Sequence, residues 1–124
     1  MKKIVTPINH SDERGIIIDL VENQNINAIT FISFKKGAVR ANHYHKKTSQ
    51  WNYITKGQIK LVTQFGEGTI NEKILQKGDL VMTLPMEKHA LVGMEDSEML
   101  VFTEGPRGGK EYESDTFRLE KKLI

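Results

Sequence analysis

Residues 37–57 read GAVRANHYHKKTSQWNYITKG and place two histidines, His43 and His45, two positions apart. Side chains at positions i and i+2 of a β-strand project from the same face, so a strand here sets the two imidazoles side by side. We expect one strand over residues 40–46 and a second over residues 50–55. The glycine at position 57 offers the positive φ that a tight hairpin requires. The stretch therefore predicts two neighbouring strands, one of which carries paired histidines.

The rest of the chain repeats this pattern of short apolar runs divided by turn-forming residues. Such runs suit strands better than helices, which need ten or more residues at a spacing of 3.6. Many short, mostly antiparallel strands predict an all-β sandwich or closed barrel, in a single domain over residues 1–124. A loop is expected over residues 104–110, and residues 119–124 are expected to form a flap or a terminal strand. The predicted strands cover residues 15–20, 28–34, 40–46, 50–55, 58–65, 69–75, 79–83, 89–92 and 99–103.

Composition and charge narrow the classes of partner. The 18 Lys and Arg residues against 16 Asp and Glu give a net charge of +2, and the basic residues are scattered along the chain. This argues against a nucleic-acid-binding surface, which concentrates positive charge on one face. The chain has no cysteine, so any metal is held by nitrogen and oxygen ligands. It also has no apolar run of the length of a signal peptide or membrane span, and we expect a cytoplasmic protein without membrane partners.

Taken alone, the histidine pair has two interpretations. Two imidazoles on one strand face can reach a single metal ion about 2.0 to 2.1 Å from each nitrogen, or can serve as catalytic groups. The alternative is a solvated strand face. His10 lies in a polar N-terminal stretch and is expected to be solvated.

The spacing of residues 37–57 resembles the first conserved motif of the cupin superfamily, with Gln50 where that motif usually has glutamate. Residues 78–93, which include His89, resemble the second cupin motif, although the glycine that usually follows its proline is absent. The resemblance implies a jelly-roll β-barrel that gathers one divalent transition metal, such as Zn, Fe, Mn or Ni, and no organic cofactor. The implied metal ligands are His43, His45, Gln50 and His89.

Two of these implied ligands have alternative roles. A neutral amide oxygen is a weaker ligand than a carboxylate, so Gln50 can instead be a hydrogen-bonding residue that orients His43 or His45. His89 can instead be a histidine at the barrel mouth that is satisfied by a backbone carbonyl.

A narrower resemblance comes from residues 12–15 (DERG) and residues 40–46 (RANHYHK) with Gln50 downstream, which are similar to stretches of the sugar-nucleotide cupins. These are the deoxysugar 3,4-ketoisomerases and the 3- and 3,5-epimerases of nucleotide-linked 4-keto sugars. Tyr112 and residues 115–118 also resemble the C-terminus of the ketoisomerases. The resemblance implies an isomerase or epimerase of a nucleotide-linked 4-keto sugar in cell-surface polysaccharide biosynthesis.

This chemistry removes a proton next to a carbonyl and returns it elsewhere. Histidine, with an unperturbed pKa of about 6.5, can take and give a proton near neutral pH. We therefore expect His45 as the base with His43 beside it, and Tyr44 or Tyr112 as the proton donor.

Arg14 and Arg40 are expected to hold the diphosphate of the substrate, because a guanidinium fork matches phosphate geometry. Alternatively, Arg14 is a surface residue paired with Asp12 or Glu13, and Arg40 is a charge at the barrel rim.

Two other functions stay open at this point. One is a metal-dependent dioxygenase, in which Fe(II) keeps an open position for oxygen, although the position of the usual carboxylate ligand is Gln50. The other is a non-catalytic cupin that binds a carbohydrate or metabolite. We expect a homodimer in each case, because the apolar residues 16–20 could exchange between subunits.

Overall fold

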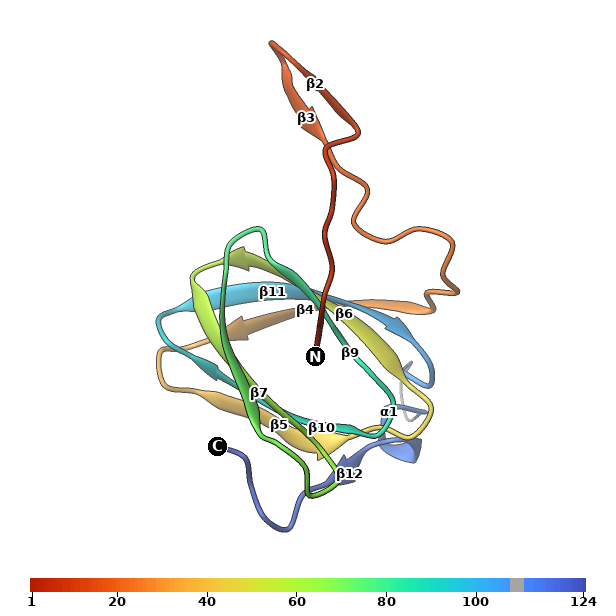
Figure 1. The fold of residues 1–124 in the computed structure, drawn as a ribbon, viewed down its shortest axis with the longest axis vertical. Coiled ribbons are helices and arrows are strands. Elements are labelled where there is room, and N and C mark those ends of the chain that lie inside the picture. The colour runs from red at the N-terminus through yellow and green to blue at the C-terminus, as the bar shows by residue number, and fades with distance from the viewer. Residues whose placement is uncertain (108–110) are drawn as a thin grey trace.

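Strands form most of the chain in the computed structural model, which describes residues 1–107 and 111–124. Two five-stranded sheets make the walls of a barrel (Figure 1). Sheet I contains, in spatial order, β1 (Lys2–Lys3), β9 (Leu80–Thr83), β6 (Ser49–Lys56), β11 (Ser97–Glu104) and β4 (Ala28–Phe34). Sheet II contains β12 (Phe117–Arg118), β5 (Val39–Tyr44), β10 (Glu87–Gly93), β7 (Gln58–Phe65) and β8 (Asn71–Gln76).

The described strands pair antiparallel throughout both sheets. The prediction of an all-β fold is therefore confirmed. A one-turn helix, α1 (Glu111–Ser114), precedes β12. In residues 1–107 and 111–124, no helix has the length and apolar character needed to cross a membrane.

A two-stranded hairpin of β2 (His10–Asp12) and β3 (Gly15–Ile17) projects from the barrel as an arm (Figure 1). The predicted strand over residues 15–20 is thus shorter than expected. It ends at Ile17, which pairs with His10, the first residue of β2. Residues 18–20 have no partner strand in the described chain and therefore do not extend β3. The predicted loop over residues 104–110 lies partly outside the described residues.

Alternation of side chains along the strands builds the core. In β11, buried and half-buried residues alternate along all eight positions, which is the period of two that places every second side chain inside a barrel. The buried apolar residues from both sheets form one cluster. It consists of Phe34, Ile54, Ile59, Leu61, Leu75, Val81, Leu91, Met99 and Val101.

The hairpin between β6 and β7 requires glycine at position 57. Gly57 has a φ of 79°, and a Cβ atom there would lie 2.3 Å from Oγ of Ser97. That hydroxyl accepts a hydrogen bond from the Gln58 amide and joins the turn to the start of β11. The last glycine of the 37–57 stretch therefore fixes the register in which β6 and β7 enter the barrel.

Candidate active site and metal centre

Strand register gathers polar side chains at one end of the barrel interior. In sheet II, His89 pairs with His43 on one side and with Thr63 on the other. In sheet I, Gln50 pairs with threonines of β9 and β11. All six side chains are buried, whereas the interior positions farther along the same strands are occupied mainly by the apolar core. The barrel therefore has a polar end and an apolar end.

Three histidines converge at the polar end. His43 comes from β5, His45 directly follows that strand, and His89 comes from β10. The ring centroid of His43 lies 4.7 Å from those of His45 and His89, and the other two centroids are 5.3 Å apart. Their candidate ligand nitrogens all lie within 4.8 Å of one another. One ion about 2.1 Å from each nitrogen requires separations of at most about 4.2 Å, so a small inward rotation of the rings is sufficient.

Backbone carbonyls fix the tautomers of two of these rings. Nδ1 of His45 lies 2.7 Å from the Asp115 carbonyl oxygen, and Nδ1 of His89 lies 2.9 Å from the Glu87 carbonyl oxygen. A carbonyl can only accept, so each Nδ1 carries the proton and each Nε2 carries a free lone pair. This is the outer hydrogen bond that metal-binding histidines commonly make.

Within the described residues, two buried nitrogens of the cluster, Nδ1 of His43 and Nε2 of His45, have no hydrogen-bond partner. Buried polar atoms without partners are rare in folded proteins, and a bound cation would satisfy both. The donor set of this cluster therefore fits a divalent transition metal.

Burial lowers the pKa of two histidines of the cluster. It lowers the pKa of His43 to about 2, with further contributions from His89 and His45 and from the guanidinium groups of Arg118 and Arg107. Burial also lowers the pKa of His89 to about 4, against the hydrogen bond to Glu87. Both rings are therefore neutral at pH 7, the form that binds a metal or accepts a proton.

Asp115 fixes the connection that follows His45. Its buried carboxylate accepts hydrogen bonds from the amides of Lys46 (2.9 Å) and Lys47 (3.0 Å) and from the hydroxyl of Thr48 (2.6 Å). Although burial raises the pKa of Asp115, these hydrogen bonds and the nearby His45 hold it below its ordinary value. One residue thus orients His45 through its carbonyl and the adjoining turn through its carboxylate.

The backbone before His43 is also unusual. Ala41 and Asn42 have φ values of 70° and 56°, a left-handed conformation that residues other than glycine seldom adopt. Asn42 Oδ1 accepts a hydrogen bond from the Leu123 amide (2.8 Å), and the Asn42 carbonyl accepts one from the Leu119 amide (2.9 Å). The C-terminal residues therefore pack on the barrel beside the strand that carries His43.

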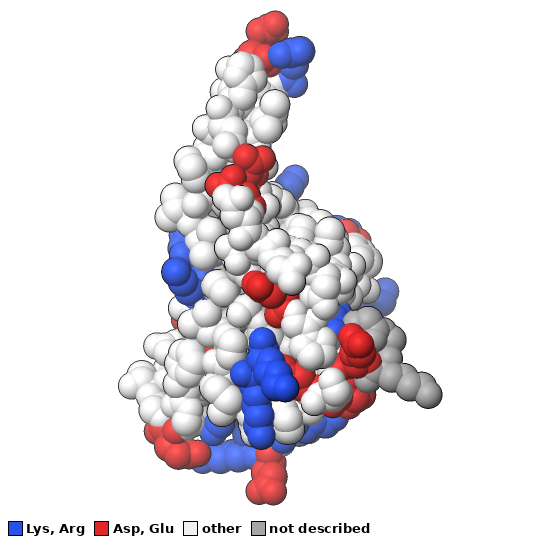
Figure 2. All heavy atoms as spheres, turned by 90° about the vertical axis from the view of Figure 1, so that its right-hand side faces the viewer, with Lys and Arg blue, Asp and Glu red and all other residues white. Residues whose placement is uncertain are grey.

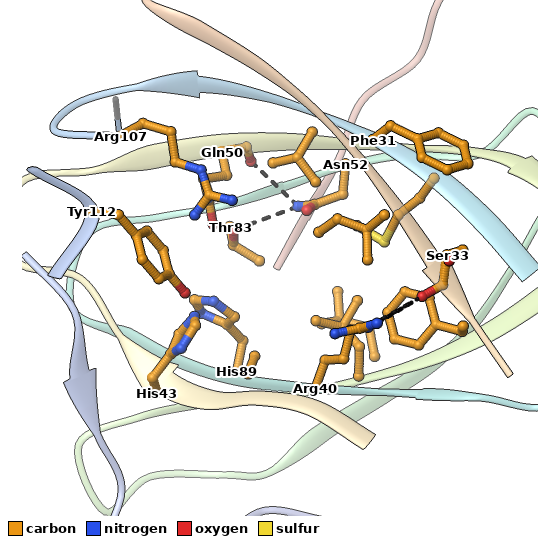
Figure 3. Close-up of a pocket in the computed structure, with 17 residues that line it drawn as sticks. Phe31, Ser33, Arg40, His43, Gln50, Asn52, Thr83, His89, Arg107 and Tyr112 are labelled. Carbon is orange, nitrogen blue, oxygen red and sulfur yellow. Dashed lines mark hydrogen bonds between the residues drawn. The ribbon is translucent and has the colours of Figure 1, made fainter. Parts of the chain in front are cut away.

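The histidines open into a cavity of about 410 Å³ between the sheets (Figure 3). His43 and His89 line it, whereas His45 is not among the lining residues that the structure describes. Figure 3 shows the Tyr112 side chain pointing toward His43 and His89, and its ring centroid is 6.5 Å from that of His43.

Arg40 and Gln50 also line the cavity. Arg40 donates two hydrogen bonds to the Ser33 carbonyl, at 3.2 and 3.0 Å, and its guanidinium lies 5.4 Å from the ring centroid of Phe34. Gln50 is on the wall opposite the histidines (Figure 3). Its Nε2 donates to Oγ1 of Thr103 at 3.3 Å. Within the described chain, its side chain hydrogen-bonds to this threonine rather than to a histidine, so it does not orient the cluster.

Two predicted residues lie outside this cavity. Tyr44 stacks on Phe117, with 5.3 Å between ring centroids, on the side of β5 opposite His43. Arg14 is 81% exposed at the turn of the arm, and its Nη2 lies 2.6 Å from Asp12. Arg14 is therefore a surface residue paired with Asp12, which was the alternative to a substrate contact.

Sequence reasoning missed two residues of the site. Arg107 follows β11 in a segment predicted only as a loop, and its guanidinium lies 4.1 Å from the ring centroid of Tyr112. The roles of Asp115 in fixing His45 and the next turn depend on contacts across about seventy positions of chain. The flanking glycines at positions 105, 108 and 109 mark Arg107 as part of a turn-rich segment, which is the only local signal that it gives.

Two antiparallel sheets that close around a histidine-lined cavity define a cupin, which confirms the predicted jelly-roll barrel. The chain belongs to the family described as the polysaccharide biosynthesis C-terminal domain, which matches residues 10–117.

Solved structures with this fold include two sugar-nucleotide enzymes. The 3,4-ketoisomerase QdtA of Thermoanaerobacterium thermosaccharolyticum, in complex with TDP, superposes with a TM-score of 0.73 and 20% identity, covering 95% of this chain and 85% of that chain. The dTDP-4-dehydrorhamnose 3,5-epimerase of Sulfolobus tokodaii has a TM-score of 0.70 and 18% identity, covering 86% and 70%. The resemblance to the sugar-nucleotide cupins is thereby confirmed in fold.

A curated relative is the pectin degradation protein KdgF of Dickeya dadantii (strain 3937). It is 32% identical over 76 residues, which are 61% of this chain and 64% of KdgF. The match thus spans less than two thirds of the length of that relative.

We expect Asp115→Asn to lower the free energy of unfolding by about 1 to 3 kcal/mol, because the amide that replaces one carboxylate oxygen cannot accept the hydrogen bonds of its neighbours. Urea unfolding measures this change. The matched control is Glu113→Gln, an exposed acid paired with Arg118 on the same segment, which should cost less than about 0.5 kcal/mol. Equal effects of the two changes would contradict the role assigned to Asp115.

Proposed function

We propose that the protein is a metal-binding isomerase or epimerase of a nucleotide-linked 4-keto sugar in cell-surface polysaccharide biosynthesis. The observation that carries this proposal is the cluster of three buried imidazoles at one end of a cavity that also contains a tyrosine and two arginines. The family of the chain supports the link to polysaccharide synthesis. The fold shared with a 3,4-ketoisomerase and a 3,5-epimerase supports the kind of reaction.

His43, His45 and His89 are the residues that would hold the metal, an ion such as Zn, Fe, Mn or Ni. A divalent metal supplies a Lewis acid that polarises the sugar carbonyl. Gln50, the fourth ligand implied by the sequence, extends from the opposite wall. We assign its amide to the sugar hydroxyls instead, because an amide competes weakly for a divalent cation.

The chain's own groups can move the proton. The phenol of Tyr112 points toward the cluster and is placed to give or take a proton at the sugar ring. In a metal-free enzyme, the base is a histidine of the cluster: His43 lines the cavity, whereas His45, the base expected from the sequence, is not among the lining residues that the structure describes.

Arg40 lies at the apolar end of the cavity, where its guanidinium can meet the diphosphate that follows the sugar. The predicted part of Arg14 in binding the diphosphate requires a second copy of the chain, because the arm projects away from the barrel (Figure 1) and Arg14 is not among the described residues that line the cavity.

We also propose a homodimer in which the arm contacts a second copy. Ile16 and Ile17 are 57% and 59% exposed on the arm, and Ile8, which precedes it, is 56% exposed. Figure 2 shows that the arm carries few charged side chains between its tip and its base. β4 ends sheet I, so one of its edges has no partner among the described strands, and Ile29 and Phe31 are exposed there. An apolar arm and an open apolar edge complement each other.

The reaction is tested by incubating the protein in D₂O with dTDP-4-keto-6-deoxyglucose and following deuterium at the carbon next to the carbonyl by NMR. We expect exchange in the wild type and a loss of about 10² to 10⁴-fold in His43→Ala and in Tyr112→Phe. His10→Ala, which removes an exposed histidine of the arm, should exchange like the wild type. Binding without exchange would instead support a non-catalytic module, and iron with oxygen uptake would support a dioxygenase.

The metal site is tested by mass spectrometry of untagged protein. We expect about one transition-metal ion per chain in the wild type and in His10→Ala, and none in the double variant His43→Ala, His45→Ala, because two of three ligands are gone. Folded wild-type protein without metal would contradict the metal site and leave proton transfer by the histidines of a metal-free enzyme.

The dimer is tested by light scattering of Ile16→Asp, Ile17→Asp. We expect the wild type to have twice the mass of one chain and this variant to have the mass of one, because charge is costly at an apolar interface. Ile74→Asp, at an exposed isoleucine of β8, is the control and should stay dimeric. A wild-type monomer, or a variant that stays dimeric, would refute the exchange of arms.

A further inference from the structure

The cavity has an unbalanced charge. Arg40 and Arg107 are the charged side chains among the described residues that line it, and none of these lining residues carries a carboxylate. The three residues outside the described part of the chain are two glycines and a lysine, so they contribute no carboxylate either. Cations in a confined cavity favour a ligand that brings its own negative charge.

The four arginines of the chain differ in how their charge is satisfied. Arg14 and Arg118 form exposed ion pairs with Asp12 and Glu113. Arg40 donates through two nitrogens to the Ser33 carbonyl. Within the described chain, Arg107 makes one side-chain hydrogen bond, from Nε to Oγ1 of Thr30 at 3.3 Å, which leaves its two terminal nitrogens for a ligand.

Arg107 is nonetheless held in place. Its guanidinium stacks 4.1 Å from the ring centroid of Tyr112. Two residues before Arg107, Gly105 makes two hydrogen bonds with the Asn27 side chain. The Gly105 amide donates to Asn27 Oδ1 at 3.1 Å, and Asn27 Nδ2 donates to the Gly105 carbonyl. A guanidinium fixed by neutral partners retains its full charge and loses little freedom when it binds an anion.

Figure 3 shows this guanidinium beside Gln50 and Tyr112, on the side of the cavity that faces His43 and His89. We propose that Arg107 is the anion anchor of the site, and that the ligand carries an oxyanion group on or next to the sugar ring that the histidines meet. This inference rests on the proposed function and narrows its substrate class. The oxyanion is either a carboxylate on the sugar or the phosphate attached to it, and in the second case Arg107 replaces Arg40 as the contact of that phosphate.

Isothermal titration of the metal-loaded protein with two probes, TDP and glucuronate, distinguishes these two sources. We expect Arg107→Gln to weaken binding of the anionic probe by about 10- to 100-fold, the range for losing charge-assisted hydrogen bonds. A loss confined to TDP identifies the phosphate, and a loss confined to glucuronate identifies the carboxylate. Arg107→Lys keeps the charge without the planar fork and should recover part of the affinity.

Arg118→Gln is the matched control. After burial and the neighbouring histidines, Arg118 and Arg107 both lower the pKa of His43, but Arg118 is 66% exposed and does not line the cavity. Arg118→Gln therefore removes an equivalent charge near the cluster without removing a contact to the ligand. We expect its affinity for the anionic probe to differ from that of the wild type by less than about threefold.

Circular dichroism and metal content verify that Arg107→Gln is folded and loaded. The proposal that Arg107 is the anion anchor is wrong if the wild-type protein binds neither probe. It is also wrong if Arg107→Gln leaves the affinity for both probes unchanged. Deuterium exchange into the keto sugar separates this result from the proposed function. Exchange together with probe binding that is independent of Arg107 sinks the anchor alone, whereas Arg107-dependent binding without exchange sinks the reaction alone.

Discussion

The carboxylate of Asp115, buried with three donors around it, is the interaction on which the site depends. It joins the C-terminal segment to the turn after β5, and the carbonyl of the same residue fixes the tautomer of His45. Tyr112 lies one helical turn earlier, and Arg107 stacks on Tyr112. The histidines of sheet II and the groups that face them are therefore held by one connection, and loosening it displaces both sides together.

The pairing register of the strands places the polar side chains of each sheet in one row. One row of paired positions across sheet II carries His43 and His89, and the matching row of sheet I carries Gln50 with two threonines. Apolar side chains fill the rest of the interior. Because burial lowers the pKa of both histidines, the polar row is uncharged, and the positive charge of the cavity comes from its arginines. Neutral imidazoles on one side and fixed cations on another suit an anionic ligand with a polarised carbonyl.

Local pattern predicted the strands and the histidine pair, because a period of two and a histidine at i and i+2 are visible in a few residues. The same reasoning does not reach contacts whose partner is distant in the chain. The motif position of Gln50 indicated a ligand, but the hydrogen bond of its side chain goes to Thr103, fifty-three positions away. The sequence around Arg14 indicated a substrate contact, whereas in the structure the residue is exposed on the hairpin and pairs with Asp12. Arg107 lies in no strand or helix pattern, so its neighbours in the chain do not indicate its place in the cavity.

The left-handed pair at Ala41 and Asn42 has a consequence for stereochemistry. It turns β5 so that His43 meets the cavity beside His89, while Leu61, Leu91 and Met99 line the apolar part of the same space. In the proposed reaction, a sugar ring that entered with its polar edge toward the histidines and an apolar edge toward these side chains would present one face to the proton donor. The new stereocentre would then form with one handedness.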